Sequence, residues 1–370
     1  MTKNLVLCLD GTSNDLAGDY TNIARTYGLL LKHPDRQVVY YDPGVGTAPD
    51  PRATTGLGRR ASLALGQAIG SGLAANVEQA YLWVCEHYEP GDRLFLFGFS
   101  RGAYTCRVLA GLIHLCGVTH RGMPNLVPYT TQLHSSADFG AAARFRKRFS
   151  VDGLHGALTK AQEPGIHFLG LYDTVAAYGW LWNPTYRPYT TNNPSVRTVR
   201  HALALDERRS PFTPLPWGRP HTDVKEVWFA GVHSDVGGGY PEKTGALSYI
   251  PLGWMLAEAV TSGLLLDDGR VRAEGLLVSA GPDAPANESL QGAQWLFQVV
   301  PKRVWSDAKG GLTWKAPRGR RSVWTDCRIH QAVFDREGYA PANLPEGCAV
   351  EPWHRRDLTE PGAPPPAGAR

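Results

Sequence analysis

The sequence has few cysteines, little net charge and no long apolar run, and each absence excludes a class of protein. Its six cysteines, at positions 8, 85, 106, 116, 327 and 348, form no CxxC pair and no zinc-site spacing. Most of them lie in apolar segments. We therefore expect buried free thiols in a reducing compartment rather than a disulfide framework.

The net charge gives no reason to expect a nucleic-acid partner. Lys and Arg total 38 against 34 Asp and Glu, which leaves a formal charge of +4 on 370 residues. No dense basic stripe stands out. The nearest approach is the run from Arg144 to Arg148, which we interpret as the solvated face of a helix.

No apolar stretch is long enough for a membrane-spanning helix. The N-terminus, "MTKNLVLCLDGTSND", enters a predicted strand almost at once and has no long h-region followed by a small-residue cleavage site. We expect cytoplasmic synthesis without a Sec signal. Export by a specialised secretion system and peripheral contact with a membrane both stay open.

Five segments share one form, a short apolar run that ends in Asp, Gly, Ser or His. They are "LVLCLDGTSND" from Leu5, "QVVYYDPGVGT" from Gln37, "RLFLFGFSRGA" from Arg93, "IHFLGLYDTVA" from Ile166 and "EVWFAGVHSDVGGGY" from Glu226. Continuous apolar runs of this length indicate strands buried on both faces. Helical patterns lie between them, at 66–88 and directly after the third run.

Alternating strands and helices predict an α/β fold with a mostly parallel central sheet and helices on both faces. We expect one domain over residues 1–360, with cap or side-layer insertions at about 120–160 and 280–350. The Pro-rich end, 361–370, is typical of a flexible tail. In such open sheets ligands bind beyond the carboxyl ends of the strands, where all five polar clusters fall.

The third run carries the clearest catalytic pattern. Gly98, Ser100 and Gly102 form a G-x-S-x-G nucleophile elbow between a predicted strand and a predicted helix. At such a turn the glycines remove clashes with neighbouring backbone, and N–H groups at the helix N-terminus can stabilise an oxyanion. The backbone N–H of Arg101 is the expected first donor. The alternative is a small residue at a purely structural turn.

A serine nucleophile needs a base, which is itself oriented by an acid. Asp173 closes the fourth run and His233 the fifth, and both are expected at the same sheet edge as the serine. Asp235 and His330 are the alternative acid and base. His201 lies in a segment that we interpret as an ion-paired helix.

The loop after the first run is expected to supply the second oxyanion donor. Gly11 permits close backbone approach, and the N–H of Gly11 or Thr12 could point inward. Asp10 is expected to hold this loop by hydrogen bonds. A metal site built from Asp10, Asp173 and Asp235 is an alternative use of the same strand ends.

Together these motifs resemble an α/β-hydrolase family of bacteria and fungi that includes the catalytic module of type VI secretion phospholipase effectors. The segments that carry the resemblance are "LCLDGTSND", "GFSRGAYTCRVLAGLI", "FLGLYDTVAAYG", "RHALALDERRSPFTPLPW", "VWFAGVHSDVGGGYPE" and "RIHQAVFDREGYAPANLP". The resemblance implies an α/β-hydrolase-like fold and an esterase or lipase activity, with Ser100 in the place of the family nucleophile. Those effectors carry extra membrane-anchoring segments, and this chain has no evident basic amphipathic helix.

We therefore expect a serine hydrolase that cleaves carboxylic esters, of the esterase, lipase or phospholipase type, through an acyl-enzyme. Its expected partner is an ester or lipid substrate, and no cofactor or metal is expected. Two alternatives belong to other classes, namely a non-catalytic binding module on a hydrolase scaffold and a metal-assisted phosphoesterase.

Overall fold

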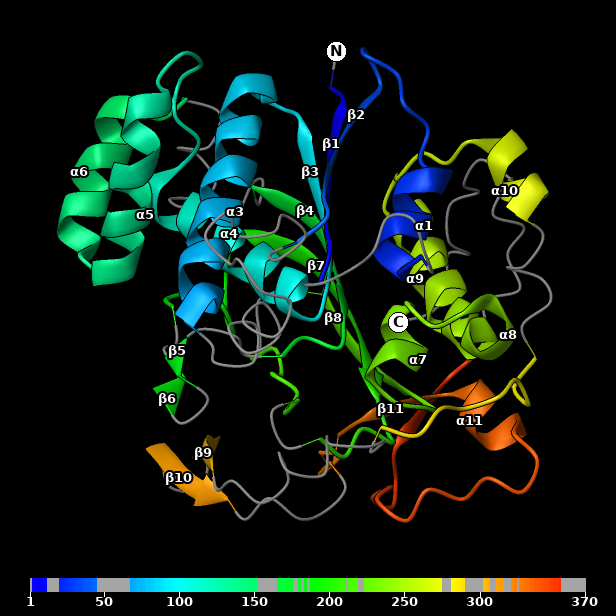
Figure 1. The fold of residues 1–370 in the computed structure, drawn as a ribbon. Coiled ribbons are helices and arrows are strands. Elements are labelled where there is room, and N and C mark those ends of the chain that lie inside the picture. The colour runs from blue at the N-terminus through cyan, green and yellow to red at the C-terminus, as the bar shows by residue number, and fades with distance from the viewer. Residues whose placement is uncertain are drawn as a thin grey trace, which may run out of the picture.

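The computed structural model places the predicted apolar runs side by side in one central sheet (Figure 1). The structure describes residues 2–11, 20–44, 67–151, 165–175, 179–180, 183–184, 187–209, 212–218, 223–274, 281–289, 302–306, 311–315, 321–324 and 326–353.

Within these residues the central sheet has eight strands, in the order β12-β11-β8-β7-β4-β3-β1-β2. Every neighbouring pair is parallel, so all the strands end at one edge. The chain adds β2 on one side of β1 and β3 on the other, so the strand order reverses at β1. The bounds are β1 Asn4–Leu9, β2 Gln37–Asp42, β3 Arg93–Phe99, β4 Ile166–Tyr172, β7 Val196–Ala204, β8 Asp223–Phe229, β11 Arg328–His330 and β12 Ala349–Glu351.

Helices cover both faces of the sheet. Helices α3 and α4 lie on one face and α1 and α9 on the other, while α5 and α6 pack outside the first pair (Figure 1). Short helices and two small hairpins complete the described structure. The bounds are α1 Asn22–Leu29, α3 Gln67–His87, α4 Arg101–Cys116, α5 Val127–Ser136, α6 Phe139–Phe149, α7 His233–Gly237, α8 Glu242–Gly245, α9 Tyr249–Thr261, α10 Asp268–Glu274 and α11 Gln331–Asp335, with the hairpin strands β5 Gly179–Trp180, β6 Asn183–Pro184, β9 Lys302–Ser306 and β10 Gly311–Lys315.

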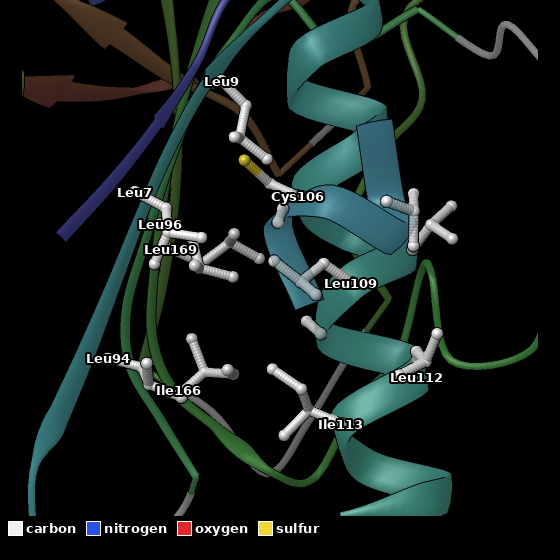
Figure 2. Close-up of a cluster of buried hydrophobic side chains, with 14 of the residues drawn as sticks. Leu7, Leu9, Leu94, Leu96, Cys106, Leu109, Leu112, Ile113, Ile166 and Leu169 are labelled. Carbon is white, nitrogen blue, oxygen red and sulfur yellow. The ribbon is translucent and has the colours of Figure 1, made fainter. Parts of the chain in front are cut away.

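The alternation of side chains along the strands builds the two largest cores, one on each face of the sheet. In β1, Leu5, Leu7 and Leu9 face α3 and α4, whereas Val6 and Cys8 face α1 and α9. Figure 2 shows the first core, in which leucines of the strands meet Leu109, Leu112 and Ile113 of α4. Because both faces are covered, β1, β3 and β4 are apolar at nearly every position, as expected for buried parallel strands. This is an α/β-hydrolase-like architecture, and the predicted fold class is confirmed.

The predicted helices at 66–88 and after the third run are confirmed as α3 and α4. The interpretation of the segment around His201 as a helix is wrong, because it is the buried strand β7, between β4 and β8. The interpretation was wrong because buried polar residues of this segment are paired with charged partners on other elements. Arg200 pairs with Glu258 and with Asp223 at 2.7 Å, so a charged sequence lies inside the sheet.

The two segments predicted as insertions, about 120–160 and 280–350, pack against different parts of the fold. Residues 120–151 form α5 and α6, which pack on the helical layer, and 152–164 lie outside the described residues. In α6, Arg144 and Arg148 are exposed, whereas Arg146 is buried and donates to the His114 carbonyl at 2.9 Å. Much of 280–350 also lies outside the described residues, but its last part adds β11 and β12 to the sheet itself. The tail at 361–370 is likewise outside them.

The expectation of six free thiols is wrong for two of them. Cys327 and Cys348 form a disulfide that joins the starts of β11 and β12. Their separation of 21 residues offers no recognisable motif in the sequence. The other four cysteines are free and buried, as predicted. No helix in the described part of the chain is long and apolar enough to cross a membrane.

Candidate active site

The polar strand ends meet at the carboxyl edge of the sheet, beside the point where the strand order reverses. Ser100 follows β3 directly, Asp173 follows β4 directly, and His233 lies a few residues beyond β8. In open parallel sheets this edge is where ligands bind. The fold therefore collects side chains from three distant parts of the chain in one place.

Ser100 occupies a strained turn between β3 and α4. Its φ of 56° and ψ of −117° lie in a region that residues with a Cβ atom rarely adopt. The Ser100 N–H donates to the Tyr172 carbonyl at 3.0 Å, which ties the turn to the end of β4. A strained residue between a strand and a helix is the backbone geometry that a nucleophile elbow requires.

The two glycines of the motif are needed for close packing around this turn. A Cβ atom on Gly98 would lie 2.6 Å from Ala103 Cα in the first turn of α4. A Cβ atom on Gly102 would lie 2.1 Å from the Leu9 carbonyl oxygen at the end of β1. Only glycine lets the start of α4 approach both strands so closely.

Asp173 is fully buried and points its carboxylate at a histidine. It too has a positive φ, 40°, and its N–H donates to the Ala202 carbonyl at 2.7 Å. Oδ2 accepts a hydrogen bond from His233 Nδ1 at 2.5 Å, and Oδ1 accepts one from the Ala204 N–H at 3.1 Å. The bond to Nδ1 fixes the tautomer of His233, so its Nε2 is the basic nitrogen.

His233 begins α7 and is held between two aromatic rings. Its ring lies 4.6 Å from the ring of Phe99 and 4.7 Å from that of Phe212, centre to centre. The His233 N–H donates to Glu207 Oε2 at 3.2 Å. Because Phe99 directly precedes Ser100, the imidazole packs beside the strand that carries the serine.

Burial and charge act in opposite directions at this pair. Burial would raise the pKa of Asp173, but the Arg321 guanidinium and His233 outweigh it and hold that pKa well below its usual range. Burial lowers the pKa of His233, and the carboxylates of Asp173 and Glu207 offset only part of that effect. The result is an ionised acid beside a neutral imidazole at neutral pH.

The hydrogen bonds between described residues do not include one from the Ser100 hydroxyl to an imidazole. Catalytic hydrogen bonds of this kind are often long in a free enzyme and shorten when substrate binds.

Asp10, directly after β1, accepts hydrogen bonds from residues on both sides of the segment 12–19, which lies outside the described residues. Asp10 Oδ1 accepts from the Gly11 N–H at 2.7 Å, and Oδ2 accepts from the hydroxyls of Thr21 at 2.6 Å and Tyr41 at 2.9 Å. Burial outweighs these bonds and raises the pKa of Asp10 to about 6. Thr12 lies outside the described residues. The Gly11 N–H, a predicted oxyanion donor, is thus engaged by Asp10.

Residues 3–258 match the family of catalytic domains described as "T6SS, Phospholipase effector Tle1-like, catalytic domain". The chain belongs to this family. Ser100, Asp173 and His233 all lie inside the matched range. Among curated proteins, "Uncharacterized protein YEL023C" of Saccharomyces cerevisiae is 34% identical over 238 residues, which cover 58% of this chain and 33% of that protein. The chain thus spans about a third of the length of this relative.

Two solved structures show a limited similarity to this chain. One is an uncharacterized protein from Pseudomonas aeruginosa, with 20% identity and a TM-score of 0.42, covering 80% of this chain and 52% of the other. The second is the Tle1 effector bound to the VgrG spike from the type 6 secretion system. It has 13% identity and a TM-score of 0.42, with coverage of 88% of this chain and 94% of the other.

In this Tle1-like domain the alternative acid and base have structural partners elsewhere. Asp235 Oδ2 accepts from the N–H groups of Val232 and Asn287, both at 3.0 Å, and so caps its own helix. His330 Nδ1 accepts from the Ala332 N–H at 3.2 Å at the start of α11. The structure brings neither into hydrogen bonding with the Asp173–His233 pair.

The alternative metal site would use Asp10, Asp173 and Asp235. Asp10, Asp173 and Asp235 each bind different donors. In the described ranges no three His, Cys, Asp or Glu side chains gather in a way that could hold a metal ion.

His201 supports the turn that follows Asp173. Its Nε2 accepts from the Thr174 N–H at 3.2 Å, and its Nδ1 donates to Glu226 Oε1 at 2.9 Å. The fully buried Arg107 donates to Thr174 Oγ1 at 3.3 Å and to the Leu215 carbonyl at 2.8 Å. His201 therefore acts in the Tle1-like domain as a rigid buried support.

Sequence reasoning missed two charged residues at the site. Glu207, in the motif "LDERR", was expected in an ion-paired helix, whereas it follows β7 and binds both Arg209 and the His233 backbone. Arg321 was not singled out, although its guanidinium binds Asp173 directly. The motif "LDERR" was the sequence signal that could have identified Glu207. Arg321 lies in an arginine-rich run, and the sequence alone does not show which of these arginines contacts the site.

Proposed function

We propose that this Tle1-like domain is a serine hydrolase that cleaves the carboxylic esters of phospholipids through an acyl-enzyme. The observation that carries the proposal is the Asp173–His233 hydrogen bond of 2.5 Å at the sheet edge where Ser100 occupies its strained elbow. A nucleophile between strand and helix, followed in chain order by an acid and a histidine, is the arrangement of α/β-hydrolases. The family description supplies the phospholipid substrate class.

In the proposed reaction the Ser100 hydroxyl attacks the ester carbonyl while His233 Nε2 takes its proton. The new bond joins Ser100 Oγ to the acyl carbon, and the imidazolium returns the proton to the departing alcohol. Asp173 stays ionised and stabilises the imidazolium through Nδ1–H. Water then repeats the cycle on the acyl-enzyme and releases the fatty acid.

The oxyanion of each tetrahedral intermediate would be held by backbone N–H groups. The Arg101 N–H opens α4, where the first N–H groups have no partner within the helix. Gly11 can donate as well if its N–H leaves the Asp10 carboxylate, from which it lies 2.7 Å away. Thr12 stays the other candidate for the second donor.

Activity-based labelling tests this proposal. A fluorophosphonate probe should label the protein, and mass spectrometry should place the adduct on Ser100. Ser100→Ala should abolish both labelling and the release of fatty acid from phospholipid in mixed micelles. Ser195→Ala is the matched control, because Ser195 is also buried and lies 2.6 Å from a histidine, His114, at another place in the fold.

The alternatives give different results. A folded protein that binds lipid but is never labelled would support a non-catalytic binding module. Activity on phosphodiesters that a chelator removes and that Ser100→Ala leaves intact would support a metal-assisted phosphoesterase. Export by a type VI system is a further proposal, supported by the family description, and would be tested by secretion from a host with and without that system.

A further inference from the structure

Arg321 makes the most extensive contact with the proposed catalytic acid. It is 7% exposed and lies beyond the part of the chain that matches the family, 3–258. Nη1 donates to Asp173 Oδ1 at 2.6 Å and Nη2 donates to Oδ2 at 2.9 Å, which is the bidentate geometry of a strong arginine–carboxylate pair. Nη1 also donates to the Ala204 carbonyl at 3.1 Å, so the backbone after β7 holds the guanidinium in turn.

With Arg321 in place the carboxylate of Asp173 has a donor for each of its lone pairs. Oδ1 accepts from the Ala204 N–H and from Arg321, and Oδ2 accepts from His233 and from Arg321. A carboxylate has about four acceptor positions, so none is left for water or for another orientation. The side chain therefore cannot rotate away from His233 without breaking at least two charge-assisted bonds.

We propose that Arg321 is a positioning residue of the reaction, which fixes the Asp173 carboxylate against His233 Nδ1 and offsets the negative charge that faces the imidazole. The inference rests on the proposed function, but it makes a separate claim about the state of His233.

The charges around His233 decide the direction of the effect. Asp173 faces it from the end of β4, Glu207 from the end of β7 and Arg321 from the segment before β11, while Arg209 pairs with Glu207 at 2.9 Å. Asp235 of its own helix is turned toward Val232 and Asn287. Removing Arg321 leaves the Asp173 carboxylate facing the imidazole without its buried cation, while Glu207 keeps its pair with Arg209. The imidazole should then hold its proton at a higher pH.

The test compares Arg321→Met and Arg321→Lys in the full 370-residue chain. His233 is followed by NMR titration of its imidazole, and ester hydrolysis is followed over the same pH range. In Arg321→Met the His233 midpoint and the acidic limb of kcat/KM should rise together by about one pH unit. A loss of carboxylate orientation should lower kcat by roughly 10- to 100-fold with little change in KM.

Arg321→Lys separates charge from geometry. Lysine restores a positive charge but cannot form the planar two-pronged contact. In Arg321→Lys the titration midpoint of the His233 imidazole should stay near that of the wild type, while kcat should fall. Arg146→Met is the matched control, because Arg146 is also 7% exposed but contacts the His114 carbonyl instead of Asp173. It should leave both readouts unchanged.

An unmoved His233 midpoint in folded Arg321→Met would overturn the proposal. If that variant does not fold, wild-type kcat in Arg321→Lys would overturn it. Should wild-type protein show no esterase activity and no labelling of Ser100, the proposed function fails. The NMR titration still measures the effect of Arg321 on His233, so the two failures can be told apart.

Discussion

Replacing Asp10 with Asn should remove a pH-dependent loss of stability from the end of β1. The Asp10 side chain is 2% exposed, and burial raises its pKa from 3.8 to about 6 even though it accepts three hydrogen bonds. The carboxylate of nearby Asp42 adds to the increase. An aspartate so placed is more costly to ionise in the folded protein than in the unfolded chain.

The sign and the size follow from that difference. Between about pH 4 and pH 6 the unfolded chain has lost this proton while the folded protein keeps it, so the contribution of Asp10 to the free energy of unfolding falls as pH rises. Above about pH 6 the contribution is constant. An increase from 3.8 to about 6 is about 2 pKa units, and at 1.36 kcal/mol per unit the total is about 3 kcal/mol.

Urea unfolding of wild type and Asp10→Asn across this pH range measures the effect. Asparagine keeps an acceptor for the Gly11 N–H, and its amide can donate to the hydroxyl of Thr21 or Tyr41, which accept as well as donate. Titration of groups that do not interact with Asp10 cancels in the comparison. The variant should gain about 3 kcal/mol relative to wild type between about pH 4 and pH 7.5.

Asp35→Asn is the control, because it makes the same substitution at an exposed position. A free-energy difference between Asp10→Asn and wild type that is the same at both ends of the range would refute the reasoning. It would mean that the three hydrogen bonds compensate fully for burial.

Three further predictions concern the acid, the elbow and the disulfide. Asp173→Asn should lower kcat about 10⁴-fold in an ester assay, because the amide favours the wrong imidazole tautomer. Asp235→Asn should keep most of the activity. If Asp235→Asn lost activity and Asp173→Asn kept it, Asp235 would be the acid instead of Asp173. Gly102→Ala should lower the thermal midpoint by an amount equal to about 2 kcal/mol, since its Cβ would lie 2.1 Å from a carbonyl oxygen. A Cβ atom on Gly28 would have no atom within 4 Å, so the thermal midpoint of Gly28→Ala should equal or exceed that of the wild type. An equal loss of stability in both variants would contradict the steric argument. The disulfide joins cysteines 21 residues apart, so its reduction should lower the free energy of unfolding by about 3 kcal/mol. A thermal midpoint that does not change when reductant is added would contradict this prediction.

The strands with continuous apolar sequence were predictable, and those stabilised by distant partners were not. β1, β3 and β4 are apolar because helices cover both faces, so local sequence is enough. β7 contains the buried polar side chains of Arg200 and His201, which are bound by Glu258 and Glu226 on other elements. A local pattern cannot reveal such partners. β11 has three residues, too few for any periodicity to appear.

The same limit applies at the candidate site. Ser100, Asp173 and His233 could be nominated because each follows the apolar run of a predicted strand, and parallel strands end at one edge of a sheet. The sequence left Asp235 and His330 as alternatives, because it does not give side-chain directions. Arg321 follows no strand of that sheet, and its partner lies 148 positions earlier in the chain.

The bond between Arg321 and Asp173 bears on where the working unit of the protein ends. A fragment cut at residue 258, where the family match stops, would keep the serine, the acid and the histidine. It would lack the guanidinium, β11 and β12, and it would end inside α9, Tyr249–Thr261. Such a fragment would contain every residue of the proposed triad and still leave a buried carboxylate without its cation. The family match therefore ends at residue 258, whereas the site with its buried cation extends at least to Arg321.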